Sequence, residues 1–140
     1  MSLLGDNLYT LRPGQADDYA FIKATWLRGM YYGDSWFSQI PKPIFMDVNS
    51  KFFDKLLLSS STKVTVACLS EDPGVILGYA ITSLSGEIAH FVYVKASWRK
   101  QGIARHLLST FPKSVSHLTK LGASLLNKIG NPIFNPYINV

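Results

Sequence analysis

The chain has 140 residues, a formal net charge of +5 at pH 7 and a single cysteine. A hydrophobic content of 47% with 16% charged residues excludes a disordered protein and suffices for one globular domain, which we expect to span residues 1–140. Cys68 has no partner for an internal disulfide, and no apolar run is long enough to cross a membrane, so we expect a cytoplasmic protein without a membrane partner.

The first half of the chain predicts one strand followed by two helices. Residues 8–12 have the composition of a strand that ends at Pro13 and Gly14. Acidic residues at 17 and 18 suit the first turn of a helix whose apolar residues recur every three or four positions, namely Tyr19, Ile22, Trp26 and Met30. A second predicted helix carries Phe52, Phe53, Leu56 and Leu57, and its candidate N-terminal caps are Asp47, Asn49 and Ser50.

The middle of the chain predicts three antiparallel strands joined by short turns. Apolar segments at 63–69, 75–82 and 87–94 are separated by Pro73-Gly74 and by Gly86, which are turn-forming residues. Simple alternation in the third segment places four side chains on one face of the sheet: Ile88, His90, Val92 and Val94.

The third of these strands runs into a basic turn that suits phosphate binding. Beyond it, the apolar period becomes helical, with Ile103, Leu107 and Leu108 on one stripe. Gly102 would let a ligand approach the backbone, and the N–H groups of residues 100–105 would point toward that ligand at the positive end of the helix dipole. Three cationic side chains favour a pyrophosphate over a single carboxylate: Arg99, Lys100 and Arg105.

This turn resembles the acyl-CoA signature of the GNAT N-acetyltransferase superfamily, which is written Arg/Gln-x-x-Gly-x-Gly/Ala. Arg99, Gly102 and Ala104 occupy its three fixed positions between a strand and a helix, as in that superfamily. The Rossmann fingerprint and the Walker loop do not fit. The resemblance implies an α/β (α+β) fold with a mixed, mostly antiparallel twisted central sheet of about six strands, flanked by about four helices.

The rest of the chain predicts elements that would complete such a fold. Residues 115–118 can form a short strand, and residues 121–129 can form a last helix that stops at Gly130. Residues 133–138 read as extended but contain Pro136, which favours an edge position in the sheet.

The resemblance also implies that acetyl-CoA is the acyl-donor cosubstrate. Family practice has the main chain of Val92 and Val94 bond the pantetheine and acetyl groups, while N–H groups of the turn hold the pyrophosphate. We therefore expect cofactor contacts from Val92, Tyr93, Val94, Arg99, Lys100, Gln101, Gly102, Ile103, Ala104, Arg105 and Asn127.

The implied reaction is direct attack of a primary amine on the thioester, which needs a base to take a proton. His90 stands where serotonin N-acetyltransferases carry an active-site histidine, and its neutral imidazole can accept a proton near pH 7, directly or through water. The other interpretation is a structural histidine inside the sheet. Glu87 is the alternative base, although it would face the other side of the strand unless a bulge shifts the register. The family's usual acid, a tyrosine in the last helix, is Leu126 here.

The aromatic segment from Trp26 to Phe37 lies where the superfamily holds its acceptor. We expect acceptor contacts from Trp26, Tyr31, Tyr32 and Trp36 and hence an aromatic or apolar amine, with packing of the same rings under the helices as the alternative. The three histidines and one cysteine lack metal-ligand spacing, so no metal site is expected.

Two further functions stay open. Leu126, together with Ile88 where relatives have histidine or glutamate, would allow a catalytically inactive GNAT-fold module that binds CoA or a partner. The net charge would allow a GNAT-fold enzyme that modifies nucleic-acid bases, but the basic residues are scattered, which disfavours nucleic acid as a partner. The apolar and aromatic content is compatible with a homodimer.

Overall fold

The computed structural model describes residues 8–33, 35–99, 102–108, 114–115 and 133–134. Four antiparallel strands, adjacent in sequence order, form the centre of its sheet: β1 (Tyr9–Pro13), β2 (Thr62–Leu69), β3 (Ile76–Ser83) and β4 (Ile88–Val94). Two short strands extend the sheet in parallel, with β5 (Ser114–Val115) beside β4 and β6 (Ile133–Phe134) beside β5. The mixed, mostly antiparallel α+β arrangement is therefore confirmed. The expected totals of strands and helices stay predictions, because residues 116–132, with the predicted last helix, lie outside the described part.

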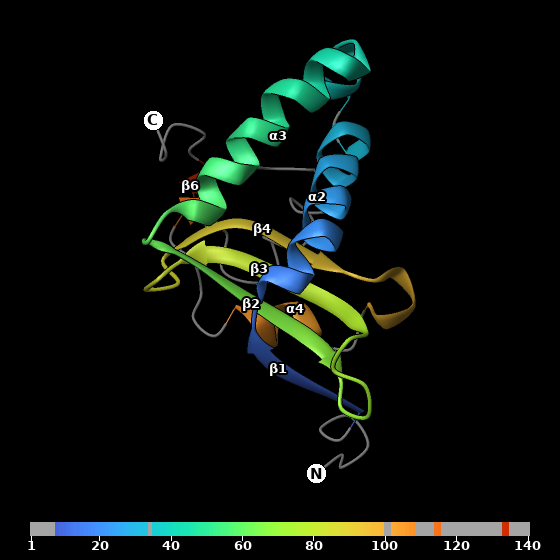
Figure 1. The fold of residues 1–140 in the computed structure, drawn as a ribbon, viewed down its shortest axis with the longest axis vertical. Coiled ribbons are helices and arrows are strands. Elements are labelled where there is room, and N and C mark those ends of the chain that lie inside the picture. Colours follow the sequence, from blue (N-terminus) through green and yellow to red (C-terminus); the bar gives the residue numbers. More distant parts are fainter. Residues whose placement is uncertain (1–7, 34, 100–101, 109–113, 116–132, 135–140) are drawn as a thin grey trace.

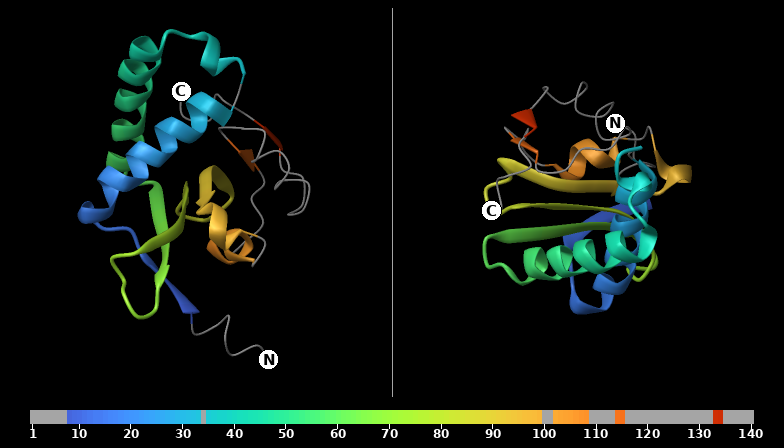
Figure 2. Two further views of the ribbon diagram at one scale, coloured as in Figure 1. Left: turned by 90° about the vertical axis from the view of Figure 1, so that its right-hand side faces the viewer. Right: turned by 90° about the horizontal axis from the view of Figure 1, so that it is seen from above.

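Helices cover both faces of this sheet. The short η1 (Ala16–Asp18) leads into α2 (Tyr19–Gly33), and η2 (Phe37–Gln39) precedes α3 (Lys42–Leu58). After β4 come η3 (Ala96–Trp98) and α4 (Ile103–Leu107). Figure 1 shows α2 and α3 in front of the sheet and α4 behind it, and the view from above in Figure 2 separates the same three layers.

The larger core fills the space between the sheet and the pair α2 and α3. The predicted stripe of α2 is confirmed, since Ile22, Trp26 and Met30 are all buried. They pack with apolar side chains from α3 and from the facing side of the sheet, namely Phe45, Phe53, Leu56, Val66, Cys68, Tyr79 and Ile81. This core fixes α2 against β3 and β4 and so sets one wall of the site described below.

A second, smaller core lies on the opposite face, under α4. Three alanines of the sheet, Ala67, Ala80 and Ala89, face Ile103 and Leu107 of the helix, and Leu108 joins the same cluster. Because alanine side chains are small, the helix can lie close to the strands. The apolar period that predicted this helix from residue 103 is therefore confirmed.

The predicted start of the second helix is wrong. The helix α3 begins at Lys42 rather than at Asp47, Asn49 or Ser50, with Pro41 as its N-cap residue and a proline in its first turn. A proline is tolerated there because the first N–H groups of a helix have no acceptor within it. The polar residues that suggested caps bond within the helix instead: Lys51 pairs with Asp47 at 3.4 Å, and Asn49 donates to the Phe45 carbonyl at 3.0 Å.

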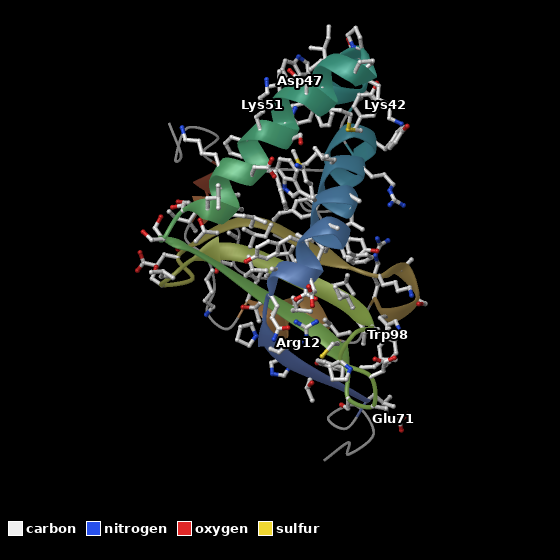
Figure 3. The ribbon with its side chains drawn as sticks, in the orientation of Figure 1. Arg12, Lys42, Asp47, Lys51, Glu71 and Trp98 are labelled. Carbon is white, nitrogen blue, oxygen red and sulfur yellow. The ribbon has the colours of Figure 1, made fainter. Side chains whose placement is uncertain are left out.

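An ion pair fastens the start of α2 to the first strand. The guanidinium of Arg12 donates two hydrogen bonds to the carboxylate of Asp18, at 2.7 and 2.8 Å, and a third to the Pro73 carbonyl at 3.0 Å. The Gln15 N–H also donates to Asp18, at 2.8 Å. Figure 3 shows Arg12 where β1 meets the beginning of α2. These hydrogen bonds, with Arg12 first, hold the pKa of Asp18 below its ordinary value.

Candidate functional site

The edge of β4 that faces away from β3 carries main-chain groups without a strand partner in the described part of the chain. The Lys95 N–H donates to the Leu77 carbonyl of β3 at 2.7 Å. Bonding toward a given neighbour alternates along an antiparallel strand, so Val94 and Val92 direct their N–H and C=O groups to the other edge. There, β5 pairs with β4 only at Ile88 and Ala89. The strands thus pair at one end, and Val92 and Val94 have no strand partner on this edge among the described residues; we call this unpaired stretch the opening beside β4.

His90 occupies a bulge in β4. Phe91 pairs with Ile81 and Ala89 pairs with Thr82, so His90 is the extra residue of the ladder. As a result Ala89, Val92 and Val94 all pack with the small core under α4, whereas Phe91 and Tyr93 pack under α2. The alternation expected for Ile88, His90, Val92 and Val94 is therefore interrupted at His90, because the bulge adds a residue.

The imidazole of His90 is almost completely buried, with 3% of its surface exposed. Burial disfavours the charged form and lowers its pKa from 6.5 to about 4. His90 is therefore neutral at pH 7 and has a nitrogen able to accept a proton, although burial makes it a weaker base than a solvated histidine.

Glu87, the alternative base, lies just before β4 and is exposed. Its main chain extends the pairing of β4 with β5 by one hydrogen bond, since the Ser114 N–H donates to the Glu87 carbonyl at 3.1 Å. Glu87 therefore stands at the closed end of the opening beside β4, and Val94 at the other end. Its role as a base stays a prediction.

Gly102 adopts the conformation that the predicted phosphate turn requires. Its φ is +81° and its ψ is 9°, a left-handed backbone conformation that residues other than glycine rarely adopt. A Cβ built at this position has no heavy atom of the described chain within 4 Å, so the space beside the backbone is open. The helix α4 starts at the next residue, and its Gly102 carbonyl accepts from the His106 N–H at 3.0 Å.

Apart from Ala104, which is half-buried in α4, the other predicted cofactor residues divide into three groups. Arg99 and Arg105 are exposed beside the turn, and the Arg99 Nε donates to the Val94 carbonyl at 3.0 Å. Ile103 is buried under the sheet, so only its main chain could meet a ligand. Tyr93 directs its main chain toward β3, as Lys95 does, and its half-buried ring stacks on Tyr79, so it offers no main-chain group at the outer edge of β4. Three predicted contacts lie outside the described residues: Lys100, Gln101 and Asn127.

The four predicted acceptor residues also separate. Trp26 is fully buried and Tyr31 is 8% exposed, and both belong to the core between α2, α3 and the sheet. Tyr32 and Trp36 are 63% and 64% exposed. Two cationic residues, Arg28 and Lys42, line the same pocket as Tyr32 and were not among the predicted site residues. Arg28 and Tyr32 are one helical turn apart, and this spacing was visible in the sequence.

The described residues contain no group of three or more metal-ligating side chains, and no described helix is long and apolar enough to cross a bilayer. His106 is exposed, and its Nδ1 lies 3.1 Å from the Tyr9 hydroxyl. His117 lies outside the described part of the chain.

Neither a protein-family model nor a curated protein matches the sequence. Solved structures do match it. A protein from Pyrococcus furiosus, provisionally assigned as an acetyl transferase, superposes with a TM-score of 0.60 at 16% identity, over 94% of this chain and 85% of that one. The aminoglycoside N-acetyltransferase AAC(6')-Iy, in complex with the bisubstrate analogue CoA-S-monomethyl-acetylneamine, superposes with a TM-score of 0.53 at 15% identity, over 94% of each chain. A GCN5-related N-acetyltransferase from Rhodopseudomonas palustris has a TM-score of 0.50 at 18% identity, over 73% of this chain and 62% of that one.

Proposed function

We propose that this chain, which has the fold of the GCN5-related (GNAT) acetyltransferases, forms a single domain that transfers an acetyl group from acetyl-CoA to a primary amine. The observations that carry the proposal are the unpaired edge of β4 at Val92 and Val94 and the left-handed Gly102 at the start of α4. The AAC(6')-Iy structures contain CoA or a CoA conjugate, which supports the same class of donor here.

The residues of the opening fit the chemical groups of acetyl-CoA. Pantetheine has two amide groups, which can pair with the outward main chain of Val92 and Val94 as an added strand would. The pyrophosphate suits the turn, where Gly102 leaves open space and Arg99 and Arg105 supply positive charge.

Acetyl-CoA would supply an activated carbonyl carbon in a thioester. The amine nitrogen forms a bond to this carbon, the carbon–sulfur bond breaks, and the proton lost by the amine balances the charge of the departing thiolate. We assign the first acceptance of this proton to His90, which is neutral at pH 7. Because His90 is buried, we propose that a water molecule between its imidazole and the amine relays the proton. Glu87, exposed at the closed end of the opening, is the alternative.

The acceptor is proposed to contact the exposed rings of Tyr32 and Trp36, whereas the buried Trp26 and Tyr31 would act only by holding α2 and the segment after it in place. The Tyr31 hydroxyl supports this role by donating to the Ile40 carbonyl at 2.9 Å.

Calorimetric titration with acetyl-CoA and with free CoA tests donor binding, and release of free thiol then tests acetyl transfer. The amine panel should contain an aromatic amine, an amino sugar of the neamine type and a lysine peptide. We expect saturable binding of both nucleotides and thiol release with at least one amine. Binding without release from any amine class would support the CoA-binding module instead, and absence of binding would refute the donor site.

A further inference from the structure

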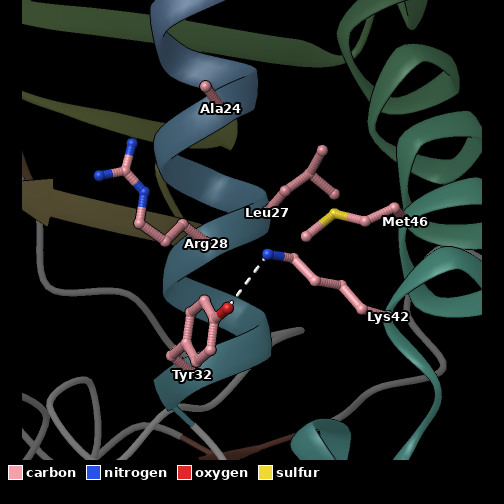
Figure 4. A pocket seen from close by; sticks show the side chains of 6 residues that line it. All are labelled: Ala24, Leu27, Arg28, Tyr32, Lys42 and Met46. Carbon is pink, nitrogen blue, oxygen red and sulfur yellow. Dashed lines mark hydrogen bonds between the residues drawn. The ribbon is translucent and has the colours of Figure 1, made fainter.

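A groove between α2 and α3 lies apart from the opening beside β4. It has a volume of about 450 Å³ and is lined by Ala24, Leu27, Arg28, Tyr32, Lys42 and Met46. In Figure 4, Leu27 of α2 points toward Met46 of α3 and Lys42 of α3 reaches the Tyr32 hydroxyl, whereas Arg28 extends from α2 on the side away from α3. This volume lies within the range of about 300 to 1,000 Å³ that is usual for small-molecule sites.

The rim of the groove is cationic. Arg28 is exposed and forms no hydrogen bond or ion pair with the residues that the structure describes, so its planar guanidinium is available to a ligand. Across the groove, the Lys42 ammonium donates to the Tyr32 hydroxyl at 3.1 Å and lies 5.4 Å from the centre of that ring. No carboxylate is among the lining residues. Two cations without a neutralising acid favour a negatively charged ligand.

The floor of the groove is apolar. Leu27 and Met46 meet between the two helices, Ala24 leaves room beside them, and the exposed ring of Tyr32 forms one side. A flexible methionine beside leucine accommodates ring or branched alkyl groups. An inorganic anion would meet only the rim, so the floor favours an anion that carries an apolar group.

The groove also faces away from the sheet. The residues of α2 that face the sheet are Ile22, Trp26 and Met30, whereas Ala24 and Arg28 lie on the exposed side of the helix. A ligand in the groove is thus separated from β4 by the body of α2, and its binding does not require the acetyl-transfer chemistry.

We propose that this groove is a second ligand site that binds a small organic carboxylate with an aromatic or branched apolar group. In this proposal the Arg28 guanidinium donates two hydrogen bonds to the carboxylate, and Lys42 adds positive charge from the other helix. The apolar part of the ligand packs against Leu27, Met46 and Tyr32. The proposal goes beyond acetyl transfer, and the groove shares only Tyr32 with the residues proposed above to contact the amine acceptor.

Amide NMR of the full chain, titrated with phenylacetate, tests the site. Phenylacetamide has the ring without the charge, and acetate has the charge without the ring. We expect saturable shifts at Ala24, Leu27, Arg28 and Met46 with phenylacetate, at least about tenfold weaker binding of either control, and unchanged affinity for acetyl-CoA. Shifts that gather at residues 102–105 instead would place the anion at the phosphate turn and overturn the proposal.

Matched charge variants sharpen the result. Arg28→Gln and Lys42→Gln should each weaken the binding of phenylacetate by about tenfold or more. Lys55→Gln, at an exposed position of α3 outside the groove, should leave the affinity for phenylacetate unchanged. All three side chains are exposed, so equal thermal unfolding should show that the fold is retained. Equal affinity in all three variants would refute the site. Saturation by an acidic peptide with none by phenylacetate would equally refute a small-molecule ligand.

Discussion

Arg99 donates a hydrogen bond from its Nε to the main-chain carbonyl of Val94, at 3.0 Å, and thereby folds the turn back onto the end of β4. Val94 directs that carbonyl to the open edge of the strand, where the proposed pantetheine arm would bind. The same side chain carries charge that would attract the pyrophosphate. Arg99 therefore competes with one part of acetyl-CoA and attracts another.

This dual position predicts opposite effects of Arg99→Met on two donors. Acetyl-CoA should bind about tenfold more weakly, because a charged partner of its pyrophosphate is lost. S-Acetylpantetheine, which has no pyrophosphate, should bind equally well or more tightly, because the Val94 carbonyl becomes available. Calorimetric titration measures both affinities, and Lys95→Met, which removes a neighbouring exposed cation, serves as the control. Equal weakening of both donors would show that Arg99 only maintains the turn.

Gly102→Ala separates backbone strain from lost ligand space. Alanine is strained at the left-handed φ of +81°, so the substitution should lower the free energy of unfolding by about 1 kcal/mol. The added methyl group has no described atom of the protein within 4 Å. Any larger loss of acetyl-CoA affinity must then come from contact with the ligand. We expect at least a tenfold loss with the alanine variant and no measurable binding with Gly102→Glu, by the same titration.

Gly86 offers a matched control for this substitution. It lies in the turn between β3 and β4 with a φ of 80°, so Gly86→Ala imposes similar backbone strain away from the proposed donor site. Chemical unfolding should give similar losses of stability for the two alanine variants, while only Gly102→Ala should lose affinity for acetyl-CoA. Parallel losses of affinity would mean that strain, rather than occupied space, weakens binding.

The features predicted correctly from the sequence are those that depend on local periodicity. The three- and four-residue spacing of Ile22, Trp26 and Met30 predicted the buried face of α2, and the spacing of Ile103, Leu107 and Leu108 predicted the buried face of α4. In each case one short segment contains the whole signal.

Of the features that the sequence did not predict, one depends on residues distant in the chain and the others on neighbouring residues. The bulge at His90 arises from pairing between β3 and β4, which alternation within β4 alone does not report. The start of α3 at Lys42 follows from a proline-containing first turn, which polar residues further along the helix obscured. For the aromatic segment the sequence left two interpretations open, acceptor contacts and packing under the helices, and helical rotation buries Trp26 and Tyr31 and exposes Tyr32.

Burial of His90 predicts a specific dependence of stability on pH. The unfolded chain binds a proton at this histidine near pH 6.5, whereas the folded chain does so only near pH 4. The free energy of unfolding should therefore fall as pH decreases from 6.5 to 4, by up to about 1.4 kcal/mol per pH unit from this group. Urea unfolding at several pH values should show a shallower decrease for His90→Gln. Identical slopes for the wild type and this variant would contradict the burial effect, and His106→Gln, at an exposed position, is the control.

The ion pair between Arg12 and Asp18 predicts a large stability cost for Asp18→Asn. Asp18 is 6% exposed, accepts two bonds from Arg12 and one from the Gln15 N–H, and joins β1 to the start of α2. Its replacement leaves the guanidinium of Arg12 without its charge partner in a partly buried place, which should cost about 2 to 4 kcal/mol in chemical unfolding at pH 7. The pair of Lys23 with Asp54 has a similar length of 2.8 Å but an aspartate side chain that is 56% exposed, so Asp54→Asn should cost less than about 1 kcal/mol. Comparable costs at the two positions would mean that burial of the first pair contributes little and that α2 is held to the sheet by its apolar face alone.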